Sequence, residues 1–252
     1  NSGSLEASSI SNKGGVITLE GDDITLTSTS RINASGATGG GNVLVGGDWQ
    51  GSGNLRQATK VSMEAGATID ASATQQGDGG KVVLWSDVHS NDSVTRVAGS
   101  IKTEGGAQGG YGGQIETSGH YLQVAPTVSI SSGRADASGS KGQWLLDPAD
   151  ITILDSGVGM LATLPPNEWN APIVITPSGS PASTSYQPAF SINATTIDVG
   201  VIANAFNSSG SVSISTTNSN GTGTGNIVIG TGVTLAIPTQ KTLSLLADGG
   251  LS

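Results

Sequence analysis

Hydrophobic residues along the chain occur in short runs that alternate with polar residues. Four such runs begin with a glycine pair and recur at irregular intervals: GGVITLEG from Gly14, GGNVLVGG from Gly40, GGKVVLWS from Gly79 and GGQIETSG from Gly112. Alternation with a period of two is typical of strands that bury one face. Helical periodicity is almost absent, so the pattern predicts an all-β chain.

A second recurring phrase precedes three of these strands. It places a β-branched residue among small polar ones, as in RINASGATGGG, ATIDASATQQGDGG and SIKTEGGAQGGYGG. Each unit thus contains a strand, a corner of Gly, Ser and Ala, a glycine pair and a second strand. Because one unit covers little of its own apolar face, its neighbours must cover the rest, as in solenoids. We therefore predict a parallel β-helix of roughly a dozen coils, at ~20 residues per coil, in a rod of about 60 Å.

The glycine pairs are the predicted corners of this architecture. We expect them to supply positive φ angles for sharp turns and to leave room for the backbone of the next layer. Structural roles of this kind are assigned to Gly79, Gly80, Gly112 and Gly113.

The second half keeps the alternation but interrupts it once. Six of the nine prolines lie in residues 165–188, and proline does not donate to a sheet ladder, so we predict a loop that leaves the rod. One short helix is expected from Thr195, with Thr196 as its cap and Ile197, Val201, Ile202, Ala205 and Phe206 on one face. Further strands are predicted at 149–154, 211–216, 225–230, 233–238 and 241–250. The predicted organisation is β-helix coils in 1–154, a proline-rich excursion in 155–194, and the helix with further coils in 195–252.

Composition narrows the classes of function. Only 35% of the residues are hydrophobic, 39 are glycine, and the net charge is −9 with no basic cluster, which argues against a nucleic-acid partner. No apolar run approaches the ~18 residues of a membrane span, and the first residues lack the pattern of a signal peptide. Cysteine is absent, which removes disulfides and thiolate metal sites. We expect a soluble segment of a longer protein.

Several phrases carry a family resemblance when taken in their order along the chain. They are GGDWQGSG at 46–53, GATIDASATQQGDGGKVVLWSD at 66–87, GGYGGQIETSG at 109–119 and GQWLLDPADITI at 142–153. Together with the stretch from Thr195, they resemble the two-partner-secretion exoproteins of Gram-negative bacteria, the filamentous haemagglutinin and high-molecular-weight adhesin family. The resemblance covers roughly residues 40–252, and WLLDP and DGGKVVLWS are its most specific parts.

The resemblance implies a right-handed parallel β-helix that forms the shaft of a secreted or surface-displayed adhesin. It also implies an outer-membrane transporter as the partner of the full-length protein, which would recognise a secretion domain preceding this segment. Trp85, Trp144 and Asp147 lie within the family-like phrases and are assigned structural packing roles.

The candidate chemistry is sparse. The carboxylates are dispersed, Asp70 and Asp78 sit among turn residues where Asp ordinarily bonds its own backbone, and His89 and His120 have no metal-ligand spacing. We assign no catalytic residue, metal or cofactor. The alternative is a β-helical polysaccharide lyase or hydrolase, which requires at least two carboxylates and a basic residue converging in one groove.

Trp169 and Tyr186 are the candidate ligand contacts, because binding residues gather on loops that a rigid scaffold presents. The predicted function is a noncatalytic adhesin shaft that presents binding surfaces for a host-cell or matrix glycan or receptor. A laterally self-associating matrix scaffold is a third reading, and sedimentation with and without calcium would separate it from a monomeric rod.

Overall fold

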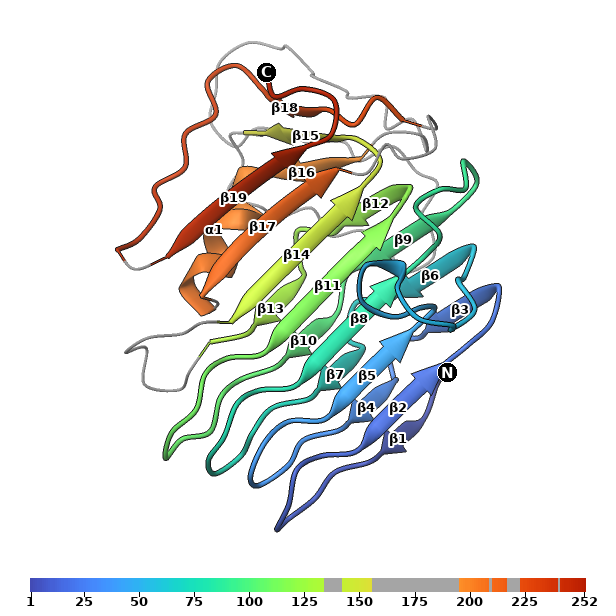
Figure 1. The fold of residues 1–252 in the computed structure, drawn as a ribbon, viewed down its shortest axis with the longest axis vertical. Helices are drawn as coiled ribbons and strands as arrows, with labels where there is room; N and C mark the ends of the chain where they lie inside the picture. Colours follow the sequence, from blue (N-terminus) through green and yellow to red (C-terminus); the bar gives the residue numbers. More distant parts are fainter. Residues whose placement is uncertain (134–141, 156–194, 209, 217–222, 240) are drawn as a thin grey trace, which may run out of the picture.

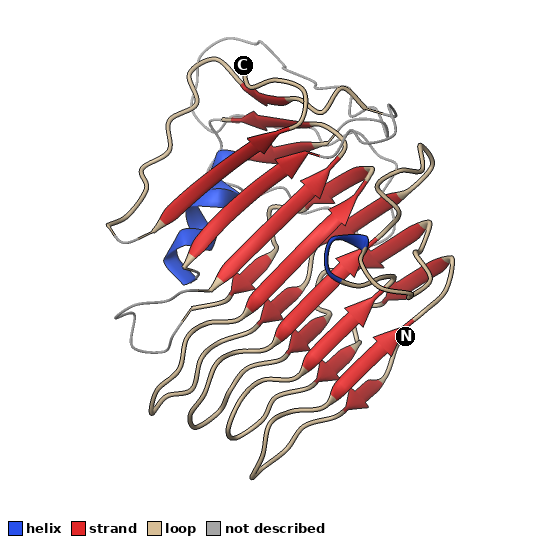
Figure 2. Cartoon of the chain, viewed as in Figure 1, coloured by secondary structure: helices blue, strands red, loops and turns tan. Residues whose placement is uncertain are grey.

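The structure is a computed structural model that describes residues 1–133, 142–155, 195–208, 210–216, 223–239 and 241–252. Its strands form three sheets, and the paired strands within each sheet run parallel (Figure 1). One α-helix lies beside them in the described part of the chain (Figure 2). The predicted all-β class, with parallel strands and one short helix, is confirmed.

Each sheet collects strands from along the whole chain. Sheet 1 contains, in spatial order, β1 (Ser4–Glu6), β4 (Arg31–Asn33), β7 (Thr68–Asp70), β10 (Ser100–Lys102) and β13 (Ser129–Ser131). Sheet 2 contains β2 (Val16–Leu19), β5 (Asn42–Val45), β8 (Lys81–Trp85), β11 (Gln114–Gly119), β14 (Gln143–Pro148), β17 (Ser211–Thr216) and β19 (Thr242–Ala247). Sheet 3 contains β3 (Asp23–Leu26), β6 (Lys60–Met63), β9 (Val94–Val97), β12 (Tyr121–Val124), β16 (Thr196–Asp198), β15 (Ile151–Leu154) and β18 (Ile227–Ile229).

From β1 to β15 the chain visits the three sheets in turn, one strand per sheet, and then begins the next layer. Successive strands of sheet 2 begin at Val16, Asn42, Lys81 and Gln114, so a layer takes 26 to 39 residues. The expected ~20 residues per coil and dozen coils were wrong. Within sheet 3, β15 and β18 lie in segments that were predicted as strands, whereas β3, β6, β9 and β12 had not been predicted, because no glycine pair introduces them.

The core lies between the sheets and is built from ladders of like residues. Ile32, Ile69, Ile101 and Ile130 pair in register along sheet 1, and each is at most 4% exposed. Such stacking gives every layer an apolar neighbour above and below, which a single layer does not provide for itself.

The glycine pairs stand where the backbones of neighbouring layers come together. A Cβ on Gly79 would lie 1.9 Å from the carbonyl oxygen of Thr103, and one on Gly112 would lie 1.6 Å from that of Ser132. Both glycines have ordinary negative or extended φ angles, as do Gly80 and Gly113, so the expectation of positive φ within the pairs was wrong. These positions require glycine because of the close approach of backbone.

The regular order changes after β15. Strand β16 follows β15 in sequence, yet it lies between β12 and β15 in sheet 3. The chain therefore turns back after β15 and places β16 between two strands from earlier layers. Helix α1 (Val199–Ser208) then packs beside β13, where a further strand of sheet 1 would lie. The predicted helix exists, but Thr196 and Ile197 belong to β16, because ladder pairing with β15 outweighs local helix signals.

Two further expectations have different outcomes. The strand predicted at 233–238 does not form: Val233 and Leu235 are partly buried, but Ile237 is 47% exposed and the segment is irregular. The proline-rich excursion lies outside the described residues from position 156 onward, and so do Trp169 and Tyr186. No helix in the described ranges is long and apolar enough to cross a membrane.

Candidate functional site

The loop of residues 46–59, between β5 and β6, covers part of the outer face of sheet 2. Figure 2 shows its 3-10 turn, Trp49–Gly51, in front of the strands. Beneath it is a second apolar cluster, separate from the main core, which consists of Leu44, Val83, Trp85 and Val88, with Trp49 and Leu55 packed against it. We call this region the loop-covered face.

Trp85 is the largest member of the cluster and is 2% exposed. Its indole Nε1 donates to the side-chain oxygen of Gln57, 3.0 Å away, which ties the loop to β8. The ammonium of Lys81 lies 5.7 Å from the ring centroid of Trp49, within the range of a cation–π contact.

A buried carboxylate lies beside this cluster. Glu116 of β11 pairs with Val83 of β8 and is fully buried. Its Oε2 accepts a hydrogen bond of 2.9 Å from the backbone N–H of Gln50, and its Oε1 accepts one of 2.9 Å from Ser118 Oγ. Gln50 has a φ of 51°, the left-handed region that costs a non-glycine residue energy. The loop conformation and the carboxylate are therefore coupled.

Burial raises the pKa of Glu116 to about 7. The hydrogen bonds from Gln50 and Ser118 oppose this shift, the nearby charge of Asp147 adds to it, and Lys81 opposes it. Since burial is the largest cause, the folded chain favours the neutral form of this carboxyl at any pH below about 7.

The stability of the folded chain is expected to fall as the pH rises from about 4.5 to about 7 because of this group. The unfolded chain releases the Glu116 proton near the ordinary value, whereas the folded chain holds it until about pH 7. The wild type should therefore lose on the order of 3 kcal/mol of unfolding free energy across this interval relative to Glu116→Gln, which does not titrate. Urea unfolding at pH 4.5, 6 and 8 measures the difference.

Glu20→Gln, at an exposed carboxylate, is the control, and its unfolding free energy should change with pH as that of the wild type does. Parallel profiles for the wild type and Glu116→Gln would show that the carboxyl of Glu116 titrates normally.

Two residues with assigned structural roles, Asp147 and Trp144, lie on β14, next to the strand that carries Glu116. Asp147 of β14 stands in register with Ser118 and is 4% exposed. Trp144 points the other way, into the main core, where it is completely buried and its Nε1 donates to Thr117 Oγ1 at 3.0 Å. His120 is 4% exposed, with Nδ1 3.2 Å from the carbonyl oxygen of Val88 and its ring edge-on to Tyr121. It is a packed residue.

Other carboxylates hold turns. Asp70 accepts from the backbone of Ser72 at 2.9 Å, as expected, whereas Asp78 accepts from the N–H of Tyr111 in the next layer. Burial alone would raise the pKa of Asp150, but hydrogen bonds from Thr224 and Asn226 outweigh it and hold that pKa below its usual value. In the described part of the chain, no three His, Cys, Asp or Glu side chains are grouped to hold a metal ion.

On the loop-covered face, the charges of Asp147 and Lys81 both act on the pKa of Glu116, a relation that the sequence did not indicate. Alternation in QIETSG places Glu116 on the outer face, but nothing in it signals that residues 46–59 cover this position. The side chain is enclosed and both oxygens accept hydrogen bonds from the protein. The arrangement fastens the loop and leaves no carboxylate oxygen of Glu116 open to a substrate.

Comparison with models of known protein families found none that matches the chain, and no curated protein matches it at a significant level.

Proposed function

We propose that this chain is a noncatalytic segment of a secreted bacterial surface adhesin, folded as a right-handed parallel β-helix that acts as a rigid shaft. The observation that carries the proposal is the regular visit of the chain to three parallel sheets, one strand per sheet in each layer. The sequence phrases that resemble the filamentous haemagglutinin and high-molecular-weight adhesin family support the same reading.

Rigidity follows from the direction of the hydrogen bonds. The strands lie across the stack, so their ladder bonds run along it and join each layer to the next. The apolar ladders continue through the same layers, as the isoleucines of sheet 1 illustrate. Bending the stack would break ladder hydrogen bonds and separate apolar side chains at the same time. The resulting resistance to bending is the mechanical property that a shaft requires.

Attachment requires a surface that the shaft presents. Trp169 and Tyr186 are the proposed ligand contacts, on the proline-rich segment 155–194, and the ligand is a host-cell or matrix glycan or receptor. The full-length protein would reach the cell exterior through an outer-membrane transporter, and no cofactor takes part.

The enzymatic alternative draws on a single observation, the action of the Asp147 and Lys81 charges on the Glu116 carboxyl. A glycoside-cleaving pair needs access to the sugar, because one carboxyl must protonate the leaving oxygen while the other acts at the ring. Glu116 is fully buried under a loop whose backbone it binds. This enclosure favours the noncatalytic reading.

A glycan array tests the proposed function. The wild-type chain is expected to bind a subset of glycans, and Trp169→Ala with Tyr186→Ala should reduce that signal about tenfold or more, because an aromatic face stacked on a sugar is lost. Tyr111→Ala, at a 44% exposed tyrosine of a glycine corner, is the matched control and should bind as the wild type does. No binding to any glycan, or cleavage of an oligosaccharide that Glu116→Gln abolishes, would overturn the proposal.

A further inference from the structure

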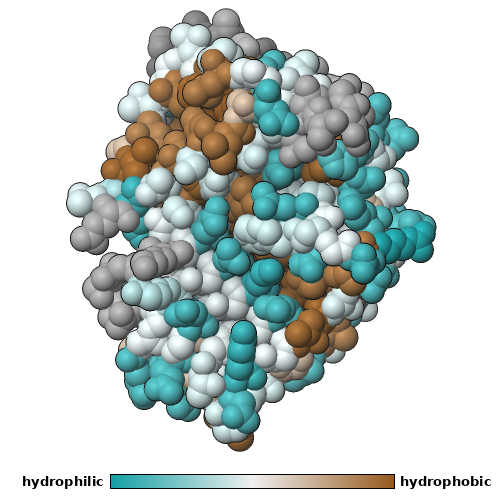
Figure 3. All heavy atoms as spheres, viewed as in Figure 1, coloured by the Kyte–Doolittle hydropathy of each residue, from teal (hydrophilic) through white to brown (hydrophobic). Residues whose placement is uncertain are grey.

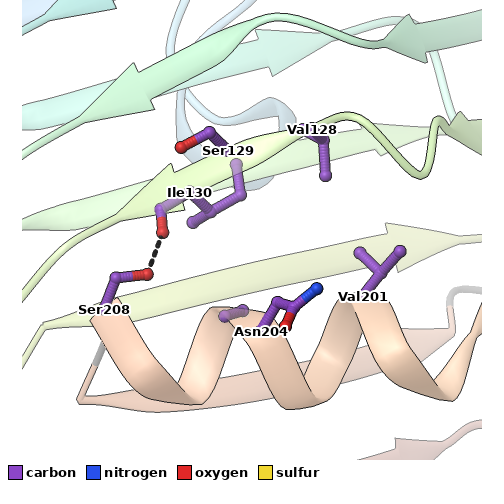
Figure 4. Close-up of a pocket in the computed structure, with 7 residues that line it drawn as sticks. Val128, Ser129, Ile130, Val201, Asn204 and Ser208 are labelled. Atoms are coloured by element: carbon purple, nitrogen blue, oxygen red, sulfur yellow. Dashed lines mark hydrogen bonds between the residues drawn. The ribbon is translucent and has the colours of Figure 1, made fainter. Parts of the chain in front are cut away.

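A cleft lies between β13 and helix α1, at the place where sheet 1 ends. It has a volume of about 100 Å³ and is lined by Val128, Ser129, Ile130, Val201, Asn204, Ala205 and Ser208 (Figure 4). A cleft of this size admits a group of a few non-hydrogen atoms rather than a whole sugar ring.

The edge of β13 faces the helix. The backbone N–H of Ser129 donates to Gly99 and the backbone carbonyl of Ser131 accepts from Thr103, at the two ends of β10, so the backbone groups of both serines point away from the helix. The hydroxyl of Ser131 points toward the helix and donates to the Ser208 carbonyl oxygen at 3.4 Å. In a parallel strand the N–H and C=O of one residue point to the same side and alternate from residue to residue. Ile130 therefore points its N–H and C=O toward α1, and its oxygen accepts a hydrogen bond of 2.5 Å from Ser208 Oγ.

Because it points away from β10, the N–H of Ile130 takes no part in the ladder of sheet 1, and it donates to no backbone carbonyl of α1. Ile130 is only 4% exposed, and a buried backbone donor without a partner costs free energy comparable to a lost hydrogen bond. The cleft beside it thus offers a donor to a ligand that carries a carbonyl oxygen.

The other residues that line the cleft indicate the polarity and charge of the group that it can bind. Val201 and Ala205 are buried apolar side chains of the helix, suited to a methyl group. Asn204 is exposed on the same helix, and its amide both donates and accepts hydrogen bonds. None of the lining residues is ionisable, so a neutral group fits better than an acid or an amine.

An acetamido group combines these features in one neutral unit: a methyl group, a carbonyl oxygen and an N–H. We propose that the cleft between β13 and α1 binds the acetamido group of an N-acetylated amino sugar, with the carbonyl oxygen accepting from Ile130 N–H. The sugar ring lies at the mouth beside Asn204 and Ser129. This inference rests on the proposed function in adhesion and supplies a ligand class for it.

An NMR titration of the whole chain tests the proposal, with methyl N-acetylglucosaminide as the probe and methyl glucoside as its comparison. The N-acetyl sugar should shift the amide resonance of Ile130 more than those of residues away from the cleft, because this N–H gains a hydrogen bond. The glucoside should leave it unchanged. Equal binding of both sugars, or shifts that avoid β13 and α1, would overturn the assignment.

Two variants on the same helix sharpen the test. Asn204→Ala should weaken binding of the N-acetyl sugar about tenfold, the loss of one or two hydrogen bonds, without unfolding the chain. Asn207→Ala, at an exposed asparagine outside the cleft, should bind as the wild type does. Identical affinities for the two variants would contradict the proposal.

A peptide with N-acetyl-lysine carries the same acetamido chemistry. Binding of this peptide without binding of the N-acetyl sugar would overturn the glycan assignment. The cleft proposal can fail while the adhesin function stands. Glycan binding that survives Asn204→Ala but is lost in Trp169→Ala with Tyr186→Ala would overturn the cleft proposal alone.

Discussion

Gly113→Ala is expected to lower the unfolding free energy by about 4 kcal/mol or more, enough to make the chain fold poorly. The added Cβ would lie 2.0 Å from the carbonyl oxygen of Gly80 and 2.6 Å from the carbonyl carbon of Gly79. Both obstacles are backbone atoms of the adjacent layer, so a change of rotamer does not relieve them. Gly113 also donates to Thr103 at 2.7 Å, a bond that joins sheet 1 to sheet 2 within one layer.

Urea unfolding followed by circular dichroism measures the effect. Gly3→Ala is the matched control, because no atom lies within 4 Å of its added Cβ, and its midpoint should stay within error of the wild type. A midpoint for Gly113→Ala equal to that of Gly3→Ala would mean that the layers are farther apart than the structure places them.

The same corner recurs through the stack. Gly41 donates to Ala34 at 2.8 Å and Gly80 donates to Ala71 at 2.8 Å, the equivalent bonds of the preceding layers. Each corner therefore constrains the spacing of two layers. A stack of layers joined at such corners has no room for a side chain at these positions, which explains why glycine pairs recur while the residues between them vary.

The sequence indicated the strands of sheet 2 because local signals for them are strong. β5, β8 and β11 follow their glycine pairs directly, and their apolar alternation is visible without knowledge of any neighbour. The strands β6, β9 and β12 of sheet 3 carry Lys60, Arg96 and Gln123 at outward positions and lack a leading glycine pair. Because they were missed, the expected length of a coil came out too short.

Alternation alone does not decide whether a segment pairs as a strand. In residues 233–238, Val233 and Leu235 are partly buried but Ile237 is 47% exposed, and no neighbouring strand pairs with the segment in the described part of the chain. At β16, pairing has the opposite effect: Ile197 joins a ladder with Ile153 even though the sequence favours a helix there. In both places the deciding contact is distant in sequence.

The loop-covered face could not be found from the sequence for the same reason. Gln50 and Glu116 are 66 positions apart, and their hydrogen bond depends on the loop folding back across β8 onto β11. Periodicity places Glu116 on the outer side of sheet 2, where solvent is the ordinary expectation for a glutamate. Figure 3 shows a different feature, an exposed apolar region over the C-terminal strands. Leu246 of β19 is itself 62% exposed.

Trp144→Ala is expected to destabilise the chain by about 4 kcal/mol. Trp144 is the largest completely buried side chain among the described residues, and it stacks on Ile115 of β11 and Val212 of β17. Its removal leaves a void that main-chain ladders on both sides hold open. The indole also donates to Thr117 Oγ1, so the variant leaves a buried hydroxyl with one bond fewer.

Trp144→Phe separates these two contributions, because it keeps most of the buried apolar volume and removes only the indole N–H. Trp144→Phe should lower the unfolding free energy by about 1–2 kcal/mol. Equilibrium unfolding of both variants, with the wild type as reference, gives the two differences directly. Because Trp144 occupies one layer of a stack whose layers depend on their neighbours, the transition of Trp144→Ala should also broaden, as the layers on either side of the void begin to unfold independently. Equal stabilities for the alanine and phenylalanine variants would show that packing at this layer contributes little, and the ladder of apolar residues would then not be what holds adjacent layers together.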